Sequence, residues 1–188
     1  MSETAIIIIA AVLVLYFIMI YNRLVALRNN VDEAWSNIDV LLKQRYEEIP
    51  KLVEVCKQYM KHEREAIDAV TAGREAAEVA RKSGDARAIG QSEATLSTAL
   101  TSLFARAEAY PDLKAVKTFS DLMSRISVLQ DSISDRREYF NEAVNLNNTR
   151  RDQFPDLIVS RLFRFGPRQL FEAPASEKQD VDVKSLFQ

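Results

Sequence analysis

The chain has 188 residues, with 25 basic and 27 acidic side chains and a formal net charge of −2, so it has no broad positive field for nucleic-acid phosphates. We therefore expect no nucleic-acid partner. Four glycines and five prolines are few for this length, which favours long helices over a turn-rich β protein. The single cysteine, Cys56, excludes an internal disulfide and a multi-cysteine zinc site.

An apolar run follows a short flank at residues 1–4, and it predicts a transmembrane helix over residues 5–22. Residues 5–21 carry no charge and would form about 25 Å of helix, close to the roughly 30 Å of a hydrocarbon core. The alternative is a cleaved signal peptide. We favour an uncleaved anchor because the flank has no basic residue and no small-x-small cleavage site precedes Arg23.

The flanking charges predict the orientation of this helix. No Lys or Arg precedes the span, whereas Arg23 and Arg28 follow it closely. Because Lys and Arg are retained on the cytoplasmic side, we expect the N-terminus outside and the body in the cytoplasm.

Residues 23–148 contain four series of apolar residues at helical spacing. They begin at Leu24, Ile49, Ile89 and Val116. Such stripes are buried when helices face one another, so we expect an all-α domain, an antiparallel up-down four-helix bundle, after the single transmembrane helix. The series together include Leu24, Leu27, Val31, Ala34, Ile38, Leu41, Ile49, Leu52, Cys56, Val70, Ala77, Ile89, Leu96, Leu103, Val116, Phe119, Ile126, Ile133, Phe140 and Val144.

The connection between the first two series, at residues 45–50, contains Pro50 but no glycine. It can be a turn, or a kink in one long helix that leaves a three-helix body. We favour the turn because an unbroken helix from Tyr21 to Ser83 would extend about 90 Å.

Residues 149–171 read as an amphipathic C-terminal segment, and residues 172–188 as a flexible acidic tail. Five arginines face two aspartates between Arg150 and Arg168, an excess of three positive charges. We predict a second, interfacial contact with membrane lipids. Alternatively, the apolar residues only cap the open end of the bundle. The candidate membrane-surface residues are Phe154, Arg161, Leu162, Arg164, Phe165 and Arg168.

Several ordered strings resemble the LemA family of bacterial membrane-anchored proteins. The resemblance implies a membrane-tethered helical bundle at the bacterial cytoplasmic (inner) membrane, and it supplies no catalytic residues. The strings are Tyr21-Asn22-Arg23-Leu24-Val25, Ala34-Trp35-Ser36-Asn37-Ile38-Asp39-Val40-Leu41-Leu42-Lys43, Lys61-His62-Glu63 and Glu108-Ala109-Tyr110-Pro111-Asp112-Leu113-Lys114-Ala115, with Phe171-Glu172 near the end.

The residues themselves indicate no enzyme, no cofactor and no metal site. His62 is the only histidine, and Ala66 stands where a zincin would need the second one. Cys56 lies on an apolar stripe and has no second cysteine to work with. Gln130 and Arg137 interrupt the last apolar series, and we interpret them as a structural polar network rather than a ligand site.

An up-down bundle brings the connections after its first and third helices to the same end. We predict a surface there that docks a protein partner; the alternative is turn chemistry and helix capping. The candidates are Arg45, Glu47, Glu48, Lys51, Glu108, Tyr110, Asp112 and Lys114.

The expected function is a membrane-tethered scaffold or adaptor that docks an unidentified protein at the cytoplasmic face. Two alternatives stay open. The chain could be an enzyme or regulator that uses carboxylate and arginine groups of the bundle, or a membrane-organising protein that forms a homo-oligomer.

Overall fold

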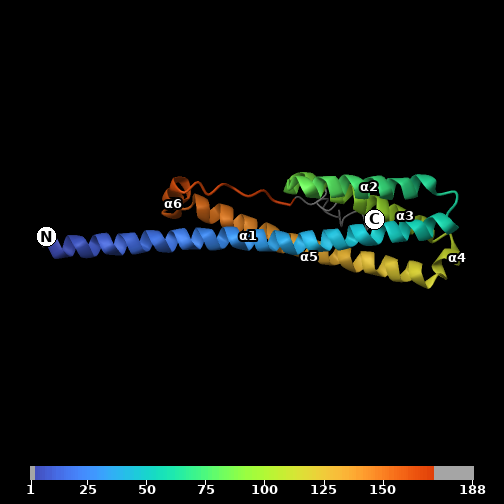
Figure 1. Cartoon of the computed structure of the whole chain (residues 1–188), viewed down its shortest axis with the longest axis horizontal. Helices are drawn as coiled ribbons and strands as arrows, with labels where there is room; N and C mark the ends of the chain where they lie inside the picture. Colours follow the sequence, from blue (N-terminus) through green and yellow to red (C-terminus); the bar gives the residue numbers. More distant parts are fainter. Residues whose placement is uncertain (1–2, 172–188) are drawn as a thin grey trace, which may run out of the picture. The chain divides into compact units, whose positions relative to one another are not determined.

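The computed structural model describes residues 3–171, and every regular element in that range is α-helical (Figure 1). The all-α prediction is therefore confirmed, while the predicted tail at 172–188 lies outside the described residues. The helices are α1 (Glu3–Tyr59), α2 (Arg64–Ser83), α3 (Ala86–Ala107), α4 (Pro111–Lys114), α5 (Lys117–Asp152) and α6 (Asp156–Leu162).

The described residues divide into two compact units. Unit 1 comprises residues 3–38 and 136–170, and unit 2 comprises residues 39–135 and Phe171. Helices α1 and α5 each contribute to both units. The up-down bundle as a whole stays a prediction.

Helix α1 continues through Pro50, so the predicted turn at residues 45–50 is wrong. A proline inside a helix costs about 3 kcal/mol. The buried stripe nevertheless continues in phase on both sides of it, and burying several large apolar side chains outweighs that loss. The chain leaves the helix only after Tyr59, at residues 60–63. The buried side chains around Pro50 are Leu42, Tyr46, Ile49, Leu52, Val53 and Cys56.

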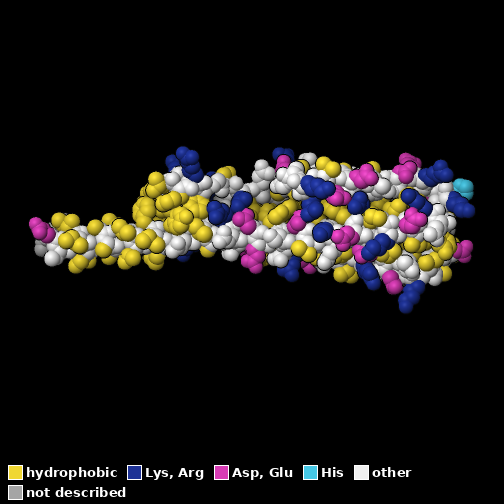
Figure 2. Space-filling model, in the orientation of Figure 1, with side chains coloured by type: hydrophobic (Ala, Val, Ile, Leu, Met, Phe, Trp, Pro, Cys, Tyr) yellow, Lys and Arg dark blue, Asp and Glu magenta, His cyan; other side chains and the backbone are white. Residues whose placement is uncertain are grey.

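The beginning of α1 is the one helix among the described residues that is long and apolar enough to span a membrane. Only 6% of its apolar window is buried, whereas the core helix of a soluble protein would be mostly buried. Figure 2 shows these hydrophobic side chains exposed along the start of α1. The segment therefore fits a single-pass membrane protein.

Unit 2 contains a close helix pair, α2 and α3. A Cβ atom at Gly73 would lie 3.3 Å from the Leu96 Cα, so the missing side chain lets the two backbones approach. Gly84 ends α2 in the left-handed conformation, with φ of 72°, and Asp85 then caps α3 by accepting from two backbone N–H groups. Residues of the turn itself, Gly84 and Asp85, therefore determine where α2 ends and α3 begins.

Unit 1 holds α6 against the first part of α1 through a small apolar cluster. Ile20 and Leu24 of α1 pack with Val159 of α6, and Phe165 packs against all three. Elsewhere in this unit the rings of Trp35 and Phe140 meet edge to face, with centroids 5.6 Å apart. The buried residues of α6 are Asp156, Val159 and Ser160, so the packing of this helix depends on a few side chains.

Candidate functional site

The structure does not gather the eight predicted docking residues into one cap. The prediction placed residues 45–51 at the end of the first helix, but α1 ends at Tyr59. The connection that meets Arg106 and Tyr110 is instead the one containing Glu63. Of the predicted residues after α3, Glu108, Asp112 and Lys114 are exposed and Tyr110 is half-buried, and Lys114 pairs with Glu108.

Arg45, predicted at a surface, is fully buried in unit 2. Its guanidinium donates to Glu93 of α3 and to Gln130 of α5, and the hydroxyl of Tyr46 donates to the other oxygen of Glu93. Arg74 donates to the backbone carbonyl oxygen of Tyr46 at 3.0 Å. These bonds compensate a buried charge that would otherwise be strongly unfavourable.

Burial and the negative charge of Glu93 raise the pKa of Tyr46 far above its usual range. The phenol therefore stays protonated and keeps donating to the carboxylate. For Gln130, the interpretation as part of a structural network agrees with these contacts. The cluster acts as an internal polar connection between α1, α3 and α5.

The burial of Arg45 could have been found from the sequence. Arg45 follows Leu42 by three positions and precedes Ile49 by four, so it lies on the same helical stripe as both. Because a turn was assumed at residues 45–50, Arg45 was assigned to a surface connection instead of to this stripe. An arginine on an apolar stripe, with Glu93 on another, is a pattern for an internal ion pair.

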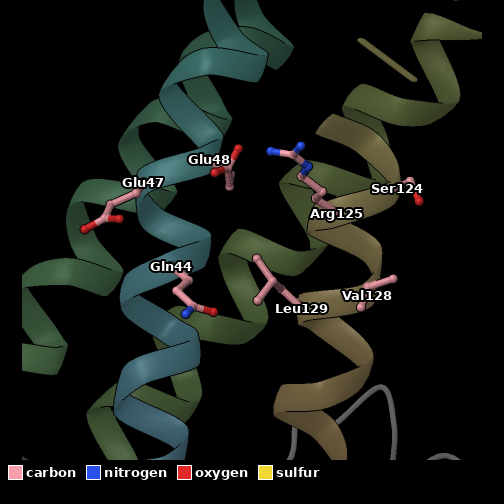
Figure 3. A pocket seen from close by; sticks show the side chains of 7 residues that line it. All are labelled: Gln44, Glu47, Glu48, Ser124, Arg125, Val128 and Leu129. Carbon is pink, nitrogen blue, oxygen red and sulfur yellow. The ribbon is translucent and has the colours of Figure 1, made fainter. Parts of the chain in front are cut away.

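A groove in unit 2 of about 480 Å³ lies between α1 and α5. In Figure 3, Glu48 and Arg125 point toward each other from these two helices, and Leu129 points toward the same gap. Lys51 donates to one Glu48 oxygen at 2.8 Å, while the other oxygen is buried without a hydrogen-bond partner. The residues that line the groove are Gln44, Glu47, Glu48, Ser124, Arg125, Val128 and Leu129.

Two of the eight predicted docking residues, Glu47 and Glu48, therefore line a groove. The α5 residues that line it with them were not predicted. Arg125 and Val128 are exposed. No local sequence pattern marks this groove, because it depends on which faces of α1 and α5 lie together.

The other chemistry-bearing residues have ordinary surroundings. Cys56 is fully buried, and burial raises the pKa of its thiol to about 11. His62 is exposed in the connection between α1 and α2. Within residues 3–171, no group of three or more His, Cys, Asp or Glu side chains is close enough to hold a metal ion.

The predicted membrane-surface residues separate into two groups in unit 1. Phe154 and Leu162 have 80% and 67% of their surface exposed, and Arg161 and Arg164 are exposed as well. Phe165 instead packs under α6, and its ring lies 5.8 Å from that of Tyr21. Phe165 therefore contributes to packing within unit 1, while the exposed group stays a candidate for contact with lipid.

The fold and these sites define a class of helical protein with one candidate membrane span among the described residues. The LemA family model matches residues 34–185, so the chain belongs to the LemA family.

Two curated relatives are the magnetosome proteins MamQ 1 and MamQ 2 of Paramagnetospirillum magneticum. Each is 25% identical to this chain over 105 residues, which is 56% of the chain. The matched region covers only 39% of each relative's length.

Proposed function

We propose that this protein is a membrane-tethered helical scaffold of the LemA type that docks a protein partner at the cytoplasmic face of a bacterial inner membrane. The apolar start of α1 supports the tether. Arg23 and Arg28, which follow the span, support the orientation, because basic residues are retained in the cytoplasm.

The groove between α1 and α5 is the observation that carries the docking role. A buried acceptor without a donor, such as the second oxygen of Glu48, costs about 1–3 kcal/mol. The Glu48 side chain is partly exposed, so a rotation of its carboxylate would bring this oxygen to the surface, where a basic side chain of a partner would recover the loss. An apolar residue of the same partner would cover Val128 and Leu129, and an acidic residue of the partner would pair with Arg125.

Site-specific photocrosslinking in cells tests this proposal on the full chain. A photoreactive residue replaces Val128, which is 60% exposed in the groove; the matched control replaces Val79 of α2, which is 69% exposed outside it. We expect one discrete adduct from position 128 and none from position 79. Equal adducts from both positions would contradict a docking groove.

Charge variants show whether the adduct depends on the groove. Glu48→Lys should remove most of the adduct, whereas Glu54→Lys, on an exposed position of α1 outside the groove, should not. An adduct at twice the 21.4 kDa of the chain would instead favour self-association. A metal or small molecule that copurifies with the chain would favour the enzyme or regulator.

A further inference from the structure

A second cavity, in unit 1, has the composition of an anion site. It has a volume of about 300 Å³ and lies among residues of α1, α5 and the segment after α6. Its lining includes three arginines, Arg28, Arg164 and Arg168, and no carboxylate. The other lining residues are Tyr21, Asn147, Phe163, Phe165, Gly166 and Pro167.

The segment that builds this cavity is held at both ends. At its start, the Phe165 N–H donates to the Ser160 carbonyl oxygen at 2.9 Å, and the Phe165 ring packs on the cluster of α1 and α6. At its end, Asn148 of α5 pairs with the backbone of Arg168 in both directions, at 2.8 and 2.9 Å. The cavity is therefore formed before any ligand arrives.

The arginines are placed by specific contacts. The Arg28 guanidinium lies 6.0 Å from the centre of the Phe165 ring, in cation–π geometry. Arg168 donates to Asp32 at 2.8 Å. Arg164 has φ of 57°, the left-handed region that a non-glycine side chain rarely adopts, and such backbone strain is concentrated at functional sites.

The cavity lies where the apolar span ends. The uncharged run stops at Tyr21, and Arg28 lies about 10 Å further along the helix. A headgroup layer is about 5–8 Å thick on each side of the hydrocarbon core. With the hydrocarbon ending near Tyr21, the cavity extends from the hydrocarbon edge at Tyr21 across the headgroup layer to its outer side at Arg28. The rings of Tyr21 and Phe163, 4.8 Å apart, form an interfacial aromatic pair.

Exposed apolar side chains lie on α6 and on Phe163, which follows α6 and lines the cavity. Phe163 is 53% exposed, and Ile158 and Leu162 of α6 are also exposed. Figure 2 shows hydrophobic side chains gathered over α6 and the adjoining part of α1. Such a patch next to a basic cavity fits a lipid surface, in which the acyl chains cover the apolar residues and the headgroup reaches the arginines.

We infer that this cavity binds the phosphate of one anionic phospholipid. The inference rests on the membrane tether of the proposed function, but not on the docking groove. Arginine binds phosphate through two parallel N–H bonds, and an anionic headgroup brings no cation to face the three arginines. A zwitterionic headgroup does bring one, so it should bind more weakly.

Lipid titration followed by native mass spectrometry tests the inference. The full chain in neutral detergent is titrated with phosphatidylglycerol, phosphatidylcholine or inorganic phosphate. We expect one retained phosphatidylglycerol per chain, with affinity about tenfold or more above that for phosphatidylcholine or free phosphate. Free phosphate that binds as tightly as the lipid would overturn the lipid assignment.

Two matched double variants separate the cavity from general surface charge. Arg28→Gln with Arg164→Gln removes two cavity arginines, and Arg23→Gln with Arg161→Gln removes two exposed arginines outside it. The cavity variant should weaken phosphatidylglycerol binding about tenfold, and the control less than about twofold. An equal loss in both would overturn the site.

Arg164→Gly excludes misfolding as the reason for lost binding. It removes one charge and relieves the left-handed backbone, so lipid affinity should fall while thermal stability stays equal or rises. Membrane fractionation is the separate control for the tether. A chain that stays in the membrane while lipid binding is unchanged by these variants would contradict the cavity site alone.

Discussion

The two units use the same pair of long helices and both have an apolar core, but they differ in where their charged and large apolar side chains lie. Unit 2 encloses a charged network, in which Arg45 and Tyr46 donate to Glu93 and Arg45 also donates to Gln130. Unit 1 leaves large apolar side chains on its surface, including Phe154 and Leu162, and holds α6 with a small cluster. The buried network favours a single internal packing of unit 2, and the exposed apolar side chains of unit 1 fit the lipid contact that we propose.

The largest effect should come from the network of unit 2. Glu93→Ala leaves the Arg45 charge buried without its carboxylate, and we expect a loss of about 3–5 kcal/mol in the free energy of unfolding. Denaturant unfolding of the full chain in detergent, followed by circular dichroism, measures it.

Glu78→Ala is the matched control for that experiment. Glu78 forms partly exposed pairs with Arg74 and Lys82, which water screens, so its loss should be much smaller. Equal effects of Glu93→Ala and Glu78→Ala would remove the contrast between a buried network and surface pairs.

The next effect should be confined to unit 1. Phe165→Ala removes the ring that packs on Ile20, Leu24 and Val159, a loss of about 1–3 kcal/mol in local stability. Amide hydrogen exchange in detergent should accelerate at least about fivefold in α6 and stay unchanged in α3. Leu162→Ala, at an exposed position, should change neither, and faster exchange throughout both units would show that α6 is not a separate local element.

A smaller effect should come from the start of α3. Asp85 accepts from the backbone N–H groups of Arg87 and Ala88 at 2.9 and 3.3 Å. Asp85→Ala should therefore lower the free energy of unfolding by about 1 kcal/mol, measured by the same denaturant titration. Asp68→Ala, on the exposed side of α2, serves as the control and should not destabilise, because alanine is the better helix former.

The smallest effect concerns pH and the connection after α1. The bond from Arg106 to Glu63 lowers the pKa of that carboxyl below its usual value of 4.5. A lowered pKa in the folded state means that the contribution to stability is present above pH 4.5 and is lost as the pH falls through the folded pKa.

Thermal melting of the full chain and of Glu63→Gln across acid pH measures this contribution. The two melting temperatures should differ slightly above pH 4.5 and converge below it. A difference that grows on acidification would reverse the sign and contradict the pair.

The sequence alone determined the helical class, the apolar span and the membership suggested by the LemA strings. These features follow from local composition and from the spacing of apolar residues. Each pattern extends over many residues, so a wrong interpretation of one residue does not change the prediction. The buried state of Cys56 was predicted in the same way, because it lies on a continuous stripe.

Only the tertiary structure decided the position of the first connection, the partner of Arg45, the groove beside Glu48 and the cavity around Arg164. Pro50 carries a local signal to stop a helix, but burial of the stripe on both sides outweighs it. The two sites combine residues that are far apart in sequence, such as Glu48 with Arg125 and Arg28 with Arg164. Their chemistry arises from which helix faces meet, and that is a sum over many weak packing energies that no local pattern records.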